Sequence, residues 1–108
     1  MMNKIYVSTI AFGDLGLSKI CQKSSEYSLN LEFSSNVPHN QTNIGLFENF
    51  CGQKLIHNYF PAPKHPFVIN LASEDKETLN KSIEHCKLNI ERTARHRLPF
   101  YAVHAGFC

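Results

Sequence analysis

The sequence predicts an α/β fold in which parallel strands alternate with helices, in the order β-α-β-α-β-α-β. Short apolar runs rich in β-branched and aromatic residues alternate with segments whose apolar residues recur every three or four positions. Each predicted strand is apolar along most of its length, which is typical of a parallel sheet buried on both faces. The 108 residues suffice for one core, so we assign residues 1–108 to a single domain.

The first half of the chain predicts two strands and two helices. The β-rich run Ile5–Thr9 opens the chain as a strand, and a turn follows it. The next segment places four residues at helical spacing: Leu17, Ile20, Cys21 and Ser24. Residues 29–33 form the second strand. A short helix at about 43–50 then precedes Gly52, where a helix-terminating glycine is expected.

The second half predicts two strands, a proline-rich loop and the longest helix. Residues 54–59 (KLIHNY) form the third strand. Pro61, Pro63 and Pro66 exclude a regular helix directly after it, because each removes a backbone donor. A helix begins near Ser73 as its N-cap and carries an apolar stripe: Leu79, Ile83, Cys86, Ile90 and Ala94. The fourth strand follows Pro99, at residues 100–107.

The charge balance argues against nucleic acid as a partner. The formal net charge is +2, which is far from the strongly basic surface that phosphate backbones attract. Arg92, Arg95 and Arg97 do cluster near the end of the long predicted helix. Cations at that end complement the helix dipole, and a phosphate-binding patch is the alternative interpretation.

Cysteine usage and hydropathy predict a cytoplasmic protein that does not enter a membrane. The four cysteines, at positions 21, 51, 86 and 108, are widely spaced and form no CxxC pair, which favours reduced thiols. The N-terminus carries no secretory signal, and no apolar run approaches the roughly 18 residues of a membrane span. Cys21 and Cys86 are expected on inward helix faces as small apolar residues.

Polar side chains gather at the carboxyl ends of the predicted strands: Thr9, Glu32, His57, Asn58 and His104. In a parallel sheet these ends meet at one edge, where chemistry collects. Taken singly, His104 could be a structural histidine and Glu32 could face solvent. Two histidines at equivalent ends of successive strands favour a metal or a polar substrate, because neutral imidazole binds divalent metals well.

Two segments resemble the xylose-isomerase-like family of TIM barrels, which includes sugar phosphate isomerases and epimerases and endonuclease IV-type enzymes. These are residues 55–73 (LIHNYFPAPKHPFVINLAS) and 101–107 (YAVHAGF). The resemblance implies half of a TIM (β/α)8 barrel, with His57 and His104 as ligands of a divalent metal such as zinc, manganese or magnesium. It places Asn58 and Glu32 near a small sugar or sugar phosphate, Glu32 by position only.

The resemblance covers four of the eight strands of such a barrel, so the ligand set is incomplete. One hypothesis is a fragment of a metal-dependent isomerase or epimerase that moves a proton next to a sugar carbonyl. Another is a phosphodiesterase acting on abasic DNA, which the weak charge disfavours. A third is a non-catalytic half-barrel that docks on a second half or on its own copy, since its sheet edges are unpaired. The end of the chain directly after the fourth strand favours a fragment.

Overall fold

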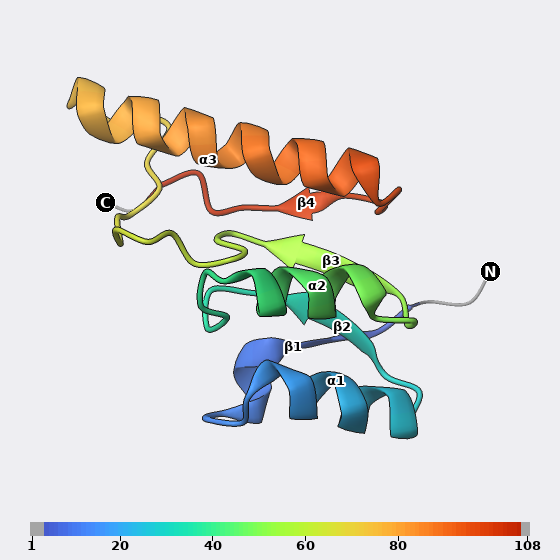
Figure 1. Ribbon diagram of the computed structural model, residues 1–108. Coiled ribbons are helices and arrows are strands. Elements are labelled where there is room, and N and C mark those ends of the chain that lie inside the picture. The colour runs from blue at the N-terminus through green and yellow to red at the C-terminus, as the bar shows by residue number, and fades with distance from the viewer. Residues whose placement is uncertain (1–3, 107–108) are drawn as a thin grey trace.

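The computed structural model describes residues 4–106, in which strands and helices alternate along the chain (Figure 1). The strands are β1 (Tyr6–Ser8), β2 (Asn30–Phe33), β3 (Lys54–His57) and β4 (Tyr101–Ala102). The helices are η1, a 3-10 turn at Thr9–Phe12, and α1 (Leu17–Glu26), α2 (Gln41–Asn49) and α3 (Lys76–Arg95). The predicted β-α-β-α-β-α-β order is confirmed. The expected fourth strand included Phe107, which lies outside the described residues.

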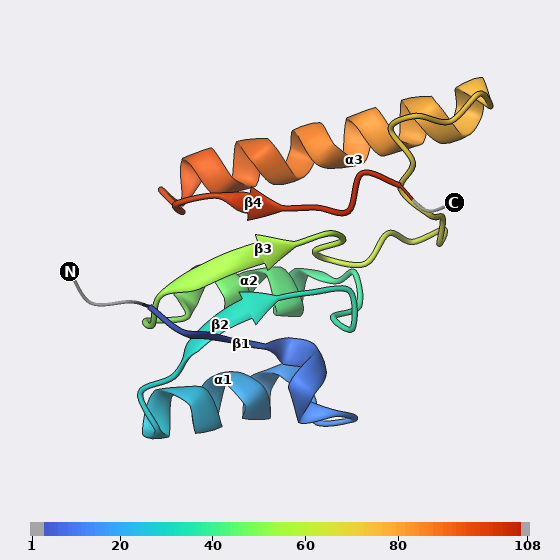
Figure 2. The same cartoon turned by 180° about the vertical axis from the view of Figure 1, so that it is seen from behind.

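All four strands are parallel, and each pairs with its neighbour in the sequence, in the order β1-β2-β3-β4. Ile56 pairs with both Phe33 and Tyr101, so these side chains share one face of the sheet. That face carries α1 and α2, and also α3, because the Tyr101 hydroxyl lies beside Asn89 of α3. In the view from behind, the strands lie in front of α2, and no helix of residues 4–106 covers the face of the sheet that is turned toward the viewer (Figure 2). A barrel winds in this one-directional way, whereas a doubly wound sheet reverses its strand order.

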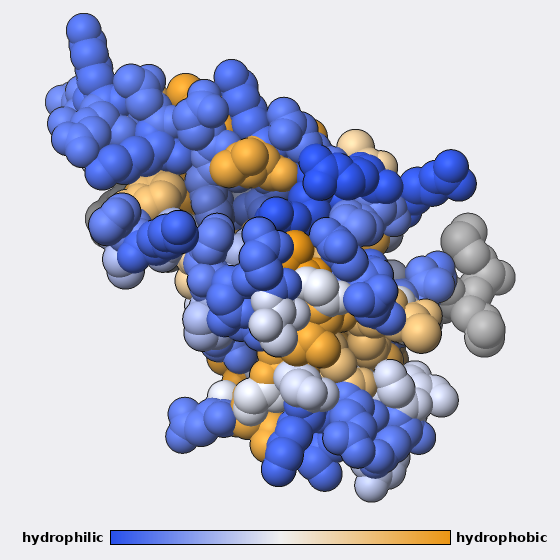
Figure 3. Space-filling model, viewed as in Figure 1, coloured by the Kyte–Doolittle hydropathy of each residue, from blue (hydrophilic) through white to orange (hydrophobic). Residues whose placement is uncertain are grey.

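The core lies between the sheet and the helices α1 and α2. Leu31 and Phe33 alternate with Asn30 and Glu32 along β2, so the apolar pair points toward the helices. The Phe33 ring packs edge-on against three other rings, those of Phe47, Phe50 and Phe60. On the outside of the helices, hydrophilic side chains dominate along α3, and apolar side chains reach the surface around α2 (Figure 3).

Two helix boundaries differ from the prediction because local hydrogen bonds decide them. The N-cap of α3 is Asp75, not Ser73, since the Asp75 carboxylate accepts the Thr78 amide hydrogen at 2.9 Å. Helix α2 begins two residues before the predicted start because the Asn40 side chain caps it through the Asn43 amide at 2.7 Å. The two hydrogen bonds that the Asp75 carboxylate accepts from Thr78, from its amide and its hydroxyl, also lower the pKa of Asp75.

Gly52 has a different role from the one predicted. It does not terminate α2 with a positive φ, because the helix already ends at Asn49 with Phe50 in an extended conformation. A Cβ on Gly52 would lie 2.7 Å from the Phe50 ring. The glycine therefore allows a close approach to a core aromatic ring.

The inward face of α3 was predicted incorrectly. Its buried residues are Ser82, Cys86, Asn89 and Thr93, whereas Ile90 is 56% exposed. Two of these polar residues bond to the segment after β3: the Asn89 amide nitrogen donates to the Asn58 carbonyl oxygen at 3.0 Å, and the Ser82 hydroxyl accepts the Asn70 amide hydrogen at 2.9 Å. Cys86 is buried as predicted, and so is Cys21 of α1. Burial raises the pKa of both thiols.

The apolar stripe of α3 exists, but it lies on a flank of the helix. By helical geometry, Ile83 and Ile90 share one flank, and His85 and Arg92 share the opposite one. His85 and Arg92 line a cavity with His39, next to α2, so the isoleucines face the open edge of β4. None of the helices within residues 4–106 has the length and apolar character required to cross a membrane.

Candidate functional site

Glu32, His57 and His104 gather at the carboxyl ends of β2, β3 and β4. The parallel pairing of these neighbouring strands carries their ends to the same edge of the sheet. Along β3 the side chains alternate, so His57 points away from the helices while Ile56 enters the core. We call these three residues the rim site. The positions of the strand ends in the sequence predict this convergence, and the structure places the three residues together.

The rim site is compact, with Glu32 and His57 half-buried and His104 exposed. His57 Nδ1 lies 4.0 Å from Glu32 Oε1, with 24% and 27% of the two side chains exposed. The imidazole rings of His57 and His104 meet edge to face, with ring centres 5.1 Å apart. A carboxylate beside one imidazole orients that ring, as carboxylates behind metal-binding histidines do.

Asn58 ties the ends of β3 and β4 together. Its φ is 51°, a left-handed conformation that asparagine tolerates better than most residues. Its backbone nitrogen donates to the Ala102 carbonyl at 2.8 Å, and its side-chain oxygen accepts the His104 amide hydrogen at 2.7 Å. The predicted substrate contact of Asn58 stays a prediction. The structure adds a role in positioning His104.

A polar network behind the sheet holds Asn58 from the other side. The Tyr101 hydroxyl donates to the Asn58 carbonyl at 2.6 Å, and the Asn89 amide nitrogen donates to the same oxygen. His85 Nε2 lies 3.0 Å from the Asn89 amide nitrogen. Burial raises the pKa of Tyr101, so its hydroxyl stays a donor at neutral pH. Sequence reasoning missed this network, although polar residues at positions 82, 85, 89 and 92 of one helix were a detectable signal.

The proline-rich loop after β3 is fastened to neighbouring segments by hydrogen bonds. The Ala62 amide donates to the Val37 carbonyl at 2.9 Å, and the Ile69 amide donates to the Tyr59 hydroxyl at 2.7 Å. Tyr59 and Phe67 line a shallow cavity of about 270 Å³, together with Ser35, Ala62, Pro63 and Pro66. These bonds fasten the loop next to the strand that carries His57.

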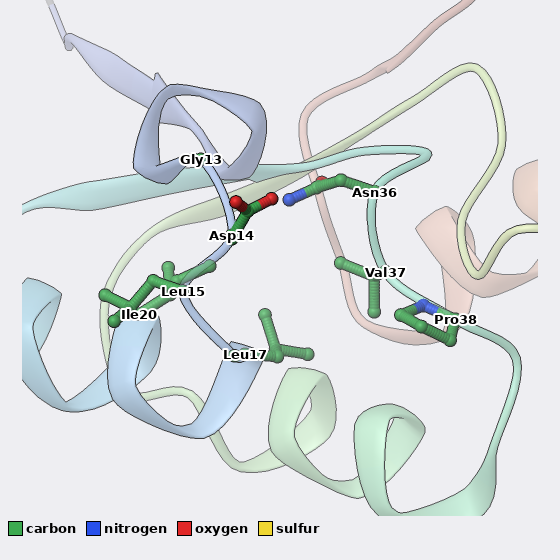
Figure 4. Close-up of a pocket in the computed structure, with 9 residues that line it drawn as sticks. Gly13, Asp14, Leu15, Leu17, Ile20, Asn36, Val37 and Pro38 are labelled. Carbon is green, nitrogen blue, oxygen red and sulfur yellow. The ribbon is translucent and has the colours of Figure 1, made fainter.

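Thr9 is a structural residue and not part of the rim site. It is fully buried, and its hydroxyl donates to Asn36 Oδ1 at 2.6 Å and accepts the Ser34 amide hydrogen at 3.1 Å. The segments before α1 and after β2 border a cavity of about 340 Å³. There the Asp14 and Asn36 side chains point toward one another (Figure 4). Most of its wall is apolar. Asp14 places a negative charge at its mouth.

The two imidazoles of the rim site have the ring-centre spacing of two ligands on one metal ion. Two imidazoles on one tetrahedral zinc ion have ring centres roughly 5 Å apart, because each centre lies about 3.2 Å from the metal. The 5.1 Å separation of His57 and His104 agrees with this value. No set of three His, Cys, Asp or Glu side chains within residues 4–106 is close enough to hold an ion as a group. Glu32 would have to move closer, or other ligands would complete the site.

Comparison of the chain with family models, with curated proteins and with solved structures finds no match. An assignment of function therefore rests on the rim site and on the open edges of the sheet.

Proposed function

We propose that His57 and His104 bind a divalent metal ion, with zinc, manganese and magnesium as candidates, in half of a TIM barrel. The observation that carries this proposal is the edge-to-face pair of imidazoles at adjacent strand ends, with a carboxylate 4.0 Å from one of them. The family that the sequence resembles performs proton transfer next to a sugar carbonyl at this place in the barrel. We infer the same reaction class here.

The chain's own residues would divide the work. When bound, the metal would polarise the carbonyl oxygen of a sugar or sugar phosphate and make the neighbouring C–H more acidic. Glu32 would orient His57 and contact a substrate hydroxyl. Asn58 would hold His104 in place and offer its amide nitrogen to the substrate. Together these residues form part of the site, and further βα units would supply the remaining ligands and the base.

Zinc binding tests the metal proposal directly. The wild-type chain is expected to bind zinc in an isothermal titration. The His57→Ala/His104→Ala variant is expected to bind it about 100-fold more weakly or worse, because even residues behind metal ligands contribute about 10- to 100-fold. The matched control is His39→Ala/His65→Ala, which removes two exposed histidines outside the rim site. Equal affinities of the wild type and the rim-site variant would refute the proposal.

A second candidate function is docking on another half-barrel. Strands β1 and β4 are the outer strands of the sheet, and Phe100, directly before β4, is 55% exposed. Ile83 and Ile90 of α3 face the same open edge. In a closed barrel the next strand would pair with β4, and the next helix would cover this flank of α3. These features favour a second copy of this half-barrel as the partner of the isolated chain.

Charge substitutions on the α3 flank test this docking. The isolated chain is expected to form dimers at concentrations of about 100 μM, as seen by light scattering after size exclusion, because an uncovered apolar edge favours association. Ile83→Glu/Ile90→Glu is expected to shift it to monomers. Leu88→Glu, on the opposite flank and 59% exposed, is the control and should leave the dimer intact. A wild-type chain that stays monomeric would rule out self-docking.

A further inference from the structure

Another cavity lies on the helix side of the sheet, away from the rim site. It has a volume of about 250 Å³ and lies between α3, the proline-rich loop and the residue that precedes α2. Arg92 and His85 line it from α3, Lys64 from the loop and His39 from the segment before α2. No aspartate or glutamate is among its lining residues. The cavity therefore concentrates positive charge.

Arg92 is a half-buried cation of this cavity, and no carboxylate of residues 4–106 lies within ion-pair distance of it. Its Nη1 donates to the Phe60 carbonyl oxygen at 3.0 Å, and its guanidinium lies over the Phe60 ring at 5.9 Å. A half-buried guanidinium normally pairs with a carboxylate or a phosphate, because desolvation of an unpaired charge is costly. Burial and the nearby Arg95 lower the pKa of Arg92, and Glu48 raises it.

His85 adds a neutral imidazole beside Arg92. Its Nε2 lies 3.0 Å from the amide nitrogen of Asn89 and 3.2 Å from the Asn58 carbonyl oxygen, so this nitrogen belongs to the polar network behind the sheet. Burial holds the pKa of His85 below its ordinary value, which favours the neutral ring at pH 7. The cavity therefore combines a fixed cation, a neutral imidazole and the ammonium group of Lys64.

We propose that this cavity binds a phosphate group, either free or as a small phosphate monoester. Arg92 offers two parallel N–H donors that match two phosphate oxygens. Lys64 and His39, both exposed, lie where they can approach the remaining oxygens. Phe60, Pro61 and Leu88 supply an apolar wall for the organic part of an ester. This site is independent of the metal proposal, because it shares no side chain with the rim site.

Phosphate titration followed by ¹H–¹⁵N correlation spectra tests the proposal. Inorganic phosphate and phenyl phosphate are the two probes, at constant ionic strength set with chloride. Saturable shifts are expected for the Arg92 and Lys64 amides, and tighter binding of phenyl phosphate would identify an ester as the preferred source. Arg92→Gln is expected to weaken binding about tenfold or more, since it removes a charge-assisted pair. Arg95→Gln, an exposed neighbour with the same charge change, is the matched control.

A second variant keeps the test decisive if Arg92→Gln fails to fold. Lys64→Gln/His39→Gln alters only exposed side chains and is expected to weaken phosphate binding severalfold without loss of dispersed spectra. Shifts that do not saturate, or that are the same in the Arg92 and Arg95 variants, would overturn the proposal. Equal affinities for acetate and for phosphate would also overturn it, because the cavity would then show no preference for phosphate over a simple carboxylate.

Discussion

Replacing Phe33 by alanine is expected to lower the free energy of unfolding by about 4 kcal/mol. The Phe33 ring is fully buried and contacts three other rings, those of Phe47, Phe50 and Phe60, at centre distances of 5.0, 5.9 and 5.3 Å. Truncation leaves a cavity that the sheet on one side and the helices on the other cannot close. Domains of this size have a total stability of about 5–15 kcal/mol, so this one change removes a large share.

Urea unfolding followed by circular dichroism measures this loss. The midpoint should fall while the slope stays constant, because the native surface is unchanged. Phe100→Ala is the control, since Phe100 is 55% exposed in the isolated chain and its removal should have little effect. If Phe33→Ala does not fold, Phe33→Leu should still fold with a loss of about 1.5 kcal/mol or less. A loss below about 1 kcal/mol in the alanine variant would contradict the described core.

The fold class was predictable because the hydrophobic periodicity and composition of a segment depend on which of its residues are buried. The segments that became β2 and β3 are the two inner strands of the sheet, and their apolar residues Leu31, Phe33 and Ile56 enter the core. Aromatic and β-branched residues such as Phe33 and Ile56 favour extended chains. The boundaries were less predictable, since they depend on single hydrogen bonds such as the one from the Thr78 amide to Asp75. Ser73 and Asp75 are both good N-caps by residue type, so the sequence alone could not choose between them.

The orientation of α3 shows that hydrophobic periodicity alone does not determine which face of a helix meets the sheet. The spacing of Ile83 and Ile90 identifies an apolar flank, but it does not say which neighbour covers that flank. The sheet instead receives Ser82 and Asn89, which are needed to bond with the polar segment around Asn58 and Asn70. An amphipathic helix packed on a parallel sheet can contact two neighbours, the sheet and the adjacent helix. A sequence pattern does not separate them.

Only the three residues of the rim site were predictable, and the residues that support them were not. Glu32, His57 and His104 follow from the rule that parallel strands end at one edge. Their supports do not, because Tyr101, Asn89 and His85 reach Asn58 from the opposite side of the sheet and from distant parts of the chain. Arg92 illustrates the same limit: the sequence placed it among three helix-end arginines, whereas the structure turns it alone toward Phe60.

The second large effect is expected from Asn58→Ala, which should cost about 2 kcal/mol of folding stability. About half comes from the lost bond between the side-chain oxygen and the His104 amide, and half from placing alanine at a positive φ. Asn58→Gly should lose less, because glycine adopts this φ without strain. Asn58→Asp keeps an acceptor at the same place and should be close to the wild type.

The same three variants separate a positioning role from a purely structural one. Asn58→Ala retains both imidazoles of the rim site, yet it frees the backbone at His104. If the imidazole pair binds zinc, this variant should bind it about tenfold more weakly, since groups behind metal ligands contribute about 10- to 100-fold. Asn58→Asp should restore the affinity, whereas Asn58→Gly should recover the part of the stability that depends on φ but not the affinity. Wild-type zinc affinity in Asn58→Ala would show that the bond to His104 does not position the ring, and wild-type stability in the same variant would show that the bond does not hold β3 and β4 together.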